Sequence, residues 1–311
     1  MKTKLLLITT LTAISMLVYS QGPAFMWAKG MGGGGTDFAY SSAVDASGNI
    51  YTTGYFNGIV DLDPGPAMYT VTSMGVADMF ITKINSAGNL IWAKQIGGAF
   101  NDYGYSITVD AAGNVFTSGY FEGTADFDPN AGVYNLTPVG GPSDIFICKL
   151  STSGNFIWAK SFGGNGEDRA YSITLDASGN IYTTGLFAGT GDFDPGAGIL
   201  NLTSNGAQDI FVSKLDVAGN LIWVKQMGGA GQDEATSITV DATGNVYTTG
   251  YFTGTVDFDP GAGANNLTSI GGWDVFISKL NSSGAFVLAK NMGGTNSSYA
   301  NSIAVDATGN I

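Results

Sequence analysis

Pairs of aspartates two residues apart are the residues in this sequence whose type and spacing could do chemistry. Asp61 and Asp63 stand directly before Pro64-Gly65, and the same pair of aspartates returns three more times. In an extended segment, side chains at i and i+2 point to one side, so their carboxylate oxygens could hold Ca²⁺. The candidate metal ligands are therefore Asp61, Asp63, Asp126, Asp128, Asp192, Asp194, Asp257 and Asp259.

The match of this loop to a known calcium-binding pattern is poor. Asp61 to Gly65 has no third Asp or Asn at its fifth position, and no bidentate Glu follows. Pro64-Gly65 instead favours a tight turn that the Asp63 side chain braces. Paired carboxylates also serve glycoside hydrolysis, but one active site needs no copy in every repeat. The sequence therefore favours a turn, leaves calcium open and makes hydrolysis the weakest alternative.

Nucleophilic and zinc chemistry are poorly supported. The sequence has no histidine and a single cysteine, Cys148. The commonest general base, most zinc sites and every Ser-His-Asp arrangement are thereby excluded. Cys148 aligns with Thr82, Ser213 and Ser278 in the repeat described below, so we expect a small residue in a buried strand. We assign no catalytic and no cofactor-binding residue, and we expect a protein that is not an enzyme.

The N-terminus has the three parts of a secretory signal peptide. Met1 to Lys4 is basic, Leu5 to Tyr19 is apolar, and Val18-Tyr19-Ser20 is a plausible cleavage motif. The apolar run is shorter than the roughly 20 residues that a membrane-spanning helix needs. We therefore predict a Sec-type signal over residues 1–20, cleavage after Ser20, and a secreted or cell-surface protein with no membrane insertion after cleavage.

The mature chain is strongly acidic. The full sequence has 12 basic and 25 acidic residues, and Lys2 and Lys4 leave with the signal, so the formal charge is 10 − 25 = −15. Nucleic acids and anionic membranes attract basic surfaces, so neither is expected as a partner. A protein or a glycan remains as the expected partner.

An internal repeat decides the expected fold. The stretch from Val44 to Gly54 recurs along the whole mature chain, and a tryptophan column repeats every 65 or 66 residues at Trp27, Trp92, Trp158 and Trp223. We divide residues 21–311 into an opening strand at 25–30, four complete units at 36–95, 101–161, 167–226 and 232–291, and a partial fifth unit at 296–311.

Each unit is expected to hold four strands. In the second unit they are Ser106–Val109, Val115–Phe121, Ile145–Leu150 and Phe156–Lys160, rich in β-branched and aromatic residues. Gly-Asn turns join the first and second and the third and fourth strands, and residues 122–143 form an insertion with a possible small hairpin at 134–137. Gly163-Gly164 is expected to begin the crossing to the next unit.

Four antiparallel strands repeated at this period, with no helix, predict one blade of a β-propeller per unit. The alternative is an open β-solenoid, whose coils are usually much shorter. The opening strand could complete the last blade of a closed ring. Because the fifth unit stops inside its first hairpin, we expect a fragment of a larger ring in an all-β fold.

The repeated motifs resemble a known family. The Val-Asp-x-x-Gly-Asn-Ile/Val-Tyr-x-Thr-Gly stretch, the segment Asp144 to Leu150 and the Gly-Gly connection resemble the bacterial beta-propeller repeat family, SBBP. The resemblance covers essentially all of the mature chain and implies propeller blades, but no catalytic residue. The Asp-Phe-Asp-Pro-Gly insertions look like a subtype of large exported bacterial proteins, often delivered to the surface by type IX secretion.

Charged residues fall almost entirely in repeated columns, which argues against a single asymmetric active site. Strand direction places Asp37, Asp61, Asp63 and Asp78 at one end of the first blade, so we expect an acidic face there. The charged residues without a counterpart, first to be tested for activity, are Glu122, Glu167, Arg169 and Glu234. We predict a secreted structural or interaction scaffold. The alternatives are a carbohydrate- or Ca²⁺-binding module on the acidic loop face and a propeller-type lyase or hydrolase.

Overall fold

The computed structural model describes residues 25–311, and all regular structure in that range is β-strand. The predicted signal peptide lies outside the described residues. Within the described part, no helix is long and apolar enough to cross a lipid bilayer.

Four four-stranded antiparallel blades follow one another along the chain. The first consists of β2 (Asp37–Val44), β3 (Ile50–Phe56), β6 (Asp78–Ile84) and β7 (Leu90–Gly98). The second consists of β8 (Asp102–Val109), β9 (Val115–Phe121), β12 (Asp144–Leu150) and β13 (Phe156–Gly164). The third consists of β14 (Arg169–Leu175), β15 (Ile181–Phe187), β18 (Asp209–Leu215) and β19 (Leu221–Gly229). The fourth consists of β20 (Asp233–Val240), β21 (Val246–Phe252), β24 (Asp274–Leu280) and β25 (Phe286–Met292).

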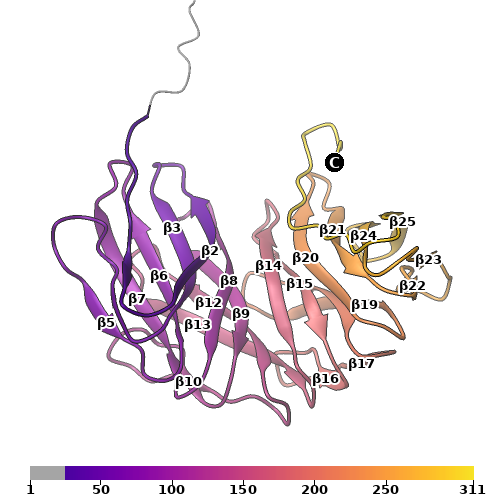
Figure 1. Cartoon of the computed structure of the whole chain (residues 1–311), viewed down its shortest axis with the longest axis horizontal. Helices are drawn as coiled ribbons and strands as arrows, with labels where there is room; N and C mark the ends of the chain where they lie inside the picture. The colour runs from indigo at the N-terminus through magenta and orange to yellow at the C-terminus, as the bar shows by residue number, and fades with distance from the viewer. Residues whose placement is uncertain (1–24) are drawn as a thin grey trace, which may run out of the picture.

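The blades form an open arc rather than a closed ring (Figure 1). The first strands of successive blades contact one another, β2 with β8, β8 with β14 and β14 with β20, so these strands line the inner edge of the arc. Residues 25–30, predicted as an opening strand, form no strand. The first strand of the described chain is the two-residue β1 (Gly32–Gly33). Residues 296–311 also form no strand. The expected β-propeller blades are therefore confirmed, while the described residues do not close a ring.

The insertion of each unit forms a hairpin, as the sequence suggested for residues 134–137. In the second, third and fourth units the hairpin joins the preceding blade, and in the first unit it pairs with β1. The four hairpins are β4 (Ile59–Asp61) with β5 (Thr70–Thr72), β10 (Ala125–Asp126) with β11 (Asn135–Leu136), β16 (Thr190–Asp192) with β17 (Asn201–Thr203), and β22 (Thr255–Asp257) with β23 (Asn266–Thr268). β10 pairs with the end of β7, where Gly98 lies opposite Ala125. A side chain at Gly98 would meet the Thr124 carbonyl oxygen at 2.2 Å, so only glycine permits this close pairing.

The glycine pair at the end of each fourth strand therefore belongs to the sheet. Gly163 and Gly164 pair with Asp192 and Gly191 of β16, which corrects the expectation that they begin the crossing. Three of the four blades are thereby extended to six strands by the unit that follows them. Each such hairpin connects two neighbouring blades through main-chain hydrogen bonds.

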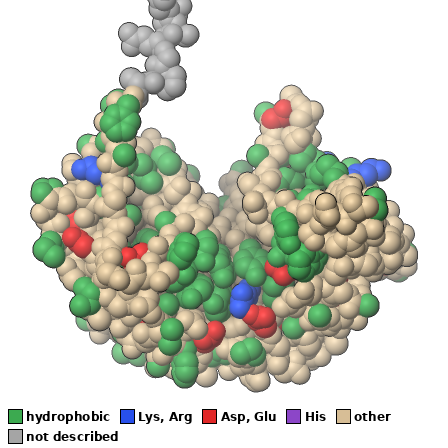
Figure 2. Space-filling model, in the orientation of Figure 1, with side chains coloured by type: hydrophobic (Ala, Val, Ile, Leu, Met, Phe, Trp, Pro, Cys, Tyr) green, Lys and Arg blue, Asp and Glu red, His purple; other side chains and the backbone are tan. Residues whose placement is uncertain are grey.

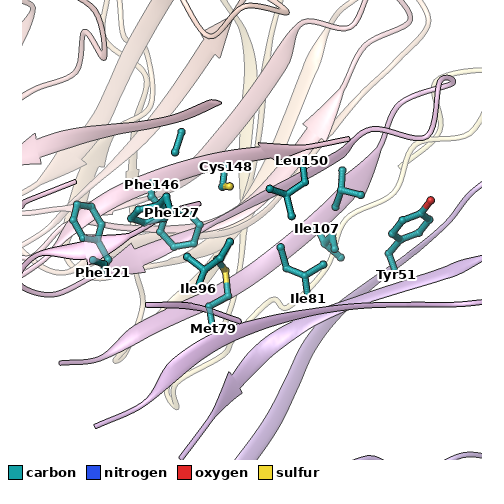
Figure 3. Close-up of a cluster of buried hydrophobic side chains, with 13 residues drawn as sticks. Tyr51, Met79, Ile81, Ile96, Ile107, Phe121, Phe127, Phe146, Cys148 and Leu150 are labelled. Atoms are coloured by element: carbon teal, nitrogen blue, oxygen red, sulfur yellow. The ribbon is translucent and has the colours of Figure 1, made fainter. Parts of the chain in front are cut away.

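The hydrophobic core lies between the blades. One cluster combines Met79, Ile81 and Ile96 of the first blade with Phe121, Phe146 and other residues of the second, all buried (Figure 3). The two faces of a single blade are apolar, and stacking against neighbours buries both of them. Cys148 lies in this cluster with 1% of its surface exposed, as its column predicted, and burial raises the pKa of its thiol.

Candidate functional site

The paired aspartates of the insertions brace their own loops. Asp61 Oδ1 accepts hydrogen bonds from the main-chain N–H of Asp63 at 3.0 Å and of Tyr69 at 2.8 Å. Asp63 Oδ1 accepts one from the Gly65 N–H at 2.7 Å. The pattern is the same for Asp126, Asp192 and Asp257. These contacts support the turn interpretation.

The calcium candidates are not brought together by the fold. Among residues 25–311, no group of three or more acidic, histidine or cysteine side chains is placed to hold a metal ion. Asp126 and Asp128 line a shallow surface pocket of about 290 Å³ that also contains Lys94, and Lys94 Nζ donates to Asn130 Oδ1 at 2.8 Å. The corresponding pocket between the third blade and the fourth unit is lined by Asp257, Asp259 and Lys225. A lysine beside the carboxylates competes with a cation.

The expected acidic face is only partly on the surface. Asp61 and Asp63 are half-buried loop residues, but Asp78 and Asp102 have 0% and 2% of their surface exposed. Their copies Asp144, Asp168, Asp209, Asp233 and Asp274 are buried as well. Asp37, Asp61, Asp63 and Asp78 each begin a repeated column. Most members of the Asp37 column and of the Asp78 column therefore lie inside the junctions between blades, because the neighbouring unit covers them.

The charged residues without a counterpart lie together at the inner edge of the arc. Glu167 forms an ion pair with Arg169 at the start of β14. The Arg169 guanidinium lies 4.6 Å from the ring centroid of Tyr120 in the second blade. Glu234, at the start of β20, accepts a hydrogen bond from the Tyr251 hydroxyl at 2.7 Å. Glu122, directly after β9, accepts a hydrogen bond from Asn101 Nδ2 at 2.9 Å, and its charge helps to raise the pKa of Tyr120, the residue that Arg169 contacts.

Tyrosines connect these charges across the blades. Tyr40, Tyr105 and Tyr171 are the bulged residues of three successive first strands. Tyr105 lies 4.7 Å from Tyr40 and 5.1 Å from Tyr171, ring centroid to ring centroid. A second contact, between Tyr55 and Tyr103, is stacked at 4.0 Å. We call Tyr40, Tyr55, Tyr103, Tyr105, Tyr120, Tyr171 and Tyr251 the inner aromatic row. Figure 2 shows hydrophobic side chains gathered along the inner side of the arc with basic and acidic side chains beside them.

Partial burial shifts the pKa values of the groups in this cluster. Burial raises the pKa of Glu234, against the lowering effect of its bond from Tyr251 and of Arg169. Burial also raises the pKa of Tyr171 to about 12. Burial disfavours the charge of Arg169, but Tyr171 and Glu167 outweigh it and raise its pKa. The site therefore offers one guanidinium, carboxyl groups and phenol hydroxyls for hydrogen bonding.

Comparison with known proteins finds a repeat family in two segments of the chain. Residues 91–120 and 222–254 match the beta-propeller repeat family, SBBP. The chain is a beta-propeller repeat protein. Both matched segments run from a fourth strand into the first two strands of the next blade, so the matches follow the blade period seen in the structure.

The curated relatives of this propeller are distant. An uncharacterized WD repeat-containing protein of Acanthamoeba polyphaga mimivirus is 26% identical over 258 residues, which is 72% of this chain and 18% of that protein. The regulatory protein FlaEY of Caulobacter vibrioides is 25% identical over 241 residues, which is 71% of this chain and 24% of that protein. The propeller thus spans about a fifth of the length of these relatives.

A solved structure of a protein of unknown function from Bacteroides caccae covers 82% of this chain at 10% identity with a TM-score of 0.31. The similarity at that TM-score is too low to bear on the fold.

The four charged residues without a copy stood out in the sequence, but no pattern indicated that they cluster in space. The missed signal is the column near the start of each repeat unit, which reads Phe38, Tyr103, Arg169, Glu234 and Tyr299. That column changes its chemistry from blade to blade, while most other columns are nearly constant. A variable column on the inner strand points to a surface with its own role.

Proposed function

We propose that this beta-propeller is a binding scaffold that acts outside the cell, secreted or at the cell surface, and is not an enzyme. The predicted signal over residues 1–20 supports export, and the acidic mature chain supports a partner other than nucleic acid or anionic lipid. The propeller supplies a rigid frame on which a few positions vary. A type IX route remains part of this proposal, on the resemblance of the insertions to exported repeat proteins.

A single observation carries the proposal. The charges that the repeat does not copy, Glu167, Arg169 and Glu234, lie side by side with the inner aromatic row. A structural repeat needs no such exception, because the other blade columns already hold the blades together. Arginine and tyrosine are also the residues that most often carry binding energy at protein surfaces.

The arrangement favours binding over catalysis. Arg169 is paired with Glu167, and Glu234 is held by Tyr251, so each charge already has a partner. With no histidine in the sequence, a proton-transfer step would depend on carboxyl and phenol groups, and Glu234 and Glu167 among them already have partners. The lyase or hydrolase alternative is therefore less well supported than binding.

Carbohydrate binding is the second candidate. Phe38 and Tyr40 have 50% and 45% of their surface exposed, and their rings stack with centroids 6.2 Å apart. Exposed aromatic faces beside carboxyl and guanidinium groups suit the apolar faces and hydroxyls of a sugar chain.

A glycan array probed with the mature chain tests both ideas in one experiment. We expect some glycans to bind and to be recovered intact, with no change in mass. Shortened or unsaturated products would contradict the non-enzymatic proposal, above all if Glu234→Gln abolished their formation. Lys94→Gln, a substitution on an outer strand, serves as the matched control because it leaves the inner edge unchanged.

A further inference from the structure

Three junctions between blades bring two buried aspartates side by side. Isolated parallel bridges join Ala77 to Asn101, Ser143 to Glu167 and Gln208 to Gln232. In each bridge the next residue on both strands is an aspartate. Neighbouring positions in a parallel pairing place their side chains on the same side, so the two carboxyl groups of each junction adjoin. The pairs are Asp78 with Asp102, Asp144 with Asp168, and Asp209 with Asp233.

The contacts of the first pair define its geometry. Asp78 Oδ2 accepts hydrogen bonds from the Met74 N–H at 2.9 Å and from Gln95 Nε2 at 2.6 Å. Asp102 Oδ2 accepts one from the Gly98 N–H at 2.7 Å. In the described structure, the Oδ1 atom of each of these aspartates is buried and has no hydrogen-bond partner.

A glycine fixes how closely the two carboxyl groups approach. A Cβ placed on Gly97 would lie 2.7 Å from Asp78 Cγ and 2.9 Å from Asp102 Oδ2. At the second junction, Asp144 Oδ1 and Asp168 Oδ2 would both lie 2.7 Å from a Cβ on Gly163. Both members of a pair therefore crowd around the same point, and only a glycine leaves room for them.

Among residues 25–311, no basic side chain forms an ion pair with these aspartates. The charged groups that act on Asp102 are Asp78 and Glu122, and those that act on Asp168 are Asp144 and Glu167. Asp209 is the charged group that acts on Asp233. Two like charges side by side in a buried site are strongly unfavourable, and a shared proton or a bound cation removes the repulsion.

The surroundings favour the proton. The groups that contact the carboxyl oxygens are N–H donors, whereas Ca²⁺ needs six to eight oxygen ligands. Within the described range, no third acidic side chain joins either carboxyl group in a metal-binding cluster. A single proton needs only the two facing oxygens.

We propose that each of the three blade junctions holds one carboxylic acid and one carboxylate that share a proton, so that the propeller is held most firmly in acid and loosens as the pH rises. Burial raises the pKa of Asp102, Asp168 and Asp233 to about 7 and that of Asp144 to about 6, and it raises the pKa of Asp78 and Asp209 as well. An aspartate in the unfolded chain titrates near 3.9.

The direction of the effect follows from these values. A group whose pKa is higher in the folded chain binds its proton more tightly there, so it stabilises the fold fully below the unfolded pKa. That stabilisation is lost as the pH rises through the folded pKa. The loss is therefore expected between about pH 4 and pH 7 to 8, with about one proton per junction released on unfolding near pH 5.5.

The fourth junction is a natural control. Asp274 occupies the same position as Asp78, but the column that supplies Asp102 supplies Ser298 here. Ser298 donates its N–H to the Trp273 carbonyl oxygen at 2.7 Å, so the two segments still meet there without a second carboxyl group. Three shared protons, and not four, are expected for the described blades.

Thermal unfolding of the mature chain between pH 4.5 and 8.5 tests the proposal. The melting temperature of the wild type should fall by several degrees over this range. A triple variant with Asp102→Asn, Asp168→Asn and Asp233→Asn should lose most of that slope, because each amide can donate to the facing carboxylate at every pH. Asp216→Asn is the matched control, since Asn85 and Asn281 already occupy its column, and it should keep the wild-type slope.

A second measurement on the wild type covers the case in which the triple variant does not fold. Carbon NMR of the aspartate carboxyl groups should show one group per junction that titrates between about pH 6 and 8. Titration of every aspartate below pH 5 would overturn the proposal. An increase of the melting temperature at pH 8 with Ca²⁺, reversed by a chelator and absent at pH 4.5, would overturn it in favour of a cation.

Discussion

Trp92 of the first blade donates its indole N–H to the main-chain carbonyl oxygen of Thr152 in the second blade, at 3.1 Å. The same column repeats the contact: Trp27 donates to Ser86 O at 3.0 Å, and Trp223 donates to Ser282 O at 3.2 Å. The acceptor lies each time in the short turn between the third and fourth strands of the following blade. The tryptophan column therefore links the fourth strand of one blade to a turn of the next by hydrogen bonds. The aspartate pairs lie at a different place, beside the parallel bridges between neighbouring blades.

Replacement of Trp92 by phenylalanine should cost at least about 1 kcal/mol of unfolding free energy, since it removes one hydrogen bond and leaves a smaller aromatic ring. Urea unfolding measures the change. Lys83 Nζ donates to the same Thr152 carbonyl oxygen at 3.2 Å, so Trp92→Phe and Lys83→Met should be non-additive. Ile91→Ala, at a neighbouring exposed position, should change stability by no more than about 0.5 kcal/mol. An unchanged midpoint for Trp92→Phe would show that the bond contributes nothing.

Replacement of Asp110 by alanine should destabilise the turn at the end of β8. Its Oδ1 atom accepts hydrogen bonds from the N–H groups of Ala112 at 2.9 Å and Asn114 at 2.8 Å. Loss of both should cost roughly 1–2 kcal/mol in urea unfolding. Asp110→Asn should retain most of the stability, because Asn85 makes the equivalent bonds in a turn of the first blade. Equal losses for both variants would mean that the charge matters rather than the acceptor.

Introduction of a side chain at Gly119 should disrupt the second blade. A Cβ there would lie 1.8 Å from the Tyr103 carbonyl oxygen, which belongs to the adjoining first strand at its bulge. We expect Gly119→Ala to cost about 3 kcal/mol or more, or to prevent soluble expression. Gly294→Ala is the matched control, because nothing lies within 4 Å of its Cβ position. Similar melting temperatures for the two variants would argue against the bulged pairing.

Calcium should not bind strongly to the paired aspartates of the insertions. The Oδ1 atoms of Asp61 and Asp63 already accept main-chain hydrogen bonds, and these hold the loop in the absence of metal. Calorimetry with chelator-treated protein is expected to show no heat of Ca²⁺ binding. A heat that disappears on joint replacement of the eight candidate aspartates by alanine would instead support the calcium-binding alternative.

Local features of the fold were predictable from the sequence, and contacts between units were not. β9 has the predicted bounds Val115–Phe121, because strand formers between two glycine-containing turns define it. β8 begins at Asp102, four residues before the predicted start at Ser106, since the bulge at Tyr105 interrupts the alternation of its side chains. The partner of three of the four hairpins lies in the preceding blade, which no pattern within one unit indicates.

The candidate site shows the same division. The sequence singled out Arg169 and Glu234 as charges without a copy, but their meeting depends on adjacent first strands contacting one another. Aspartates at strand ends normally face water, so the sequence predicts these columns on the surface. The burial of Asp78 and Asp102 depends on the neighbouring blade, which no pattern within one unit indicates.

The central claim is that the inner edge of the arc binds a partner through Arg169 and its neighbours. Its most direct test is the affinity of the mature chain for the strongest ligand on the glycan array, measured by calorimetry for the wild type, Arg169→Gln and Lys94→Gln. We expect Arg169→Gln to lower the affinity at least about tenfold and Lys94→Gln to leave it unchanged. Equal affinities for the wild type and Arg169→Gln, with both proteins folded, would contradict it.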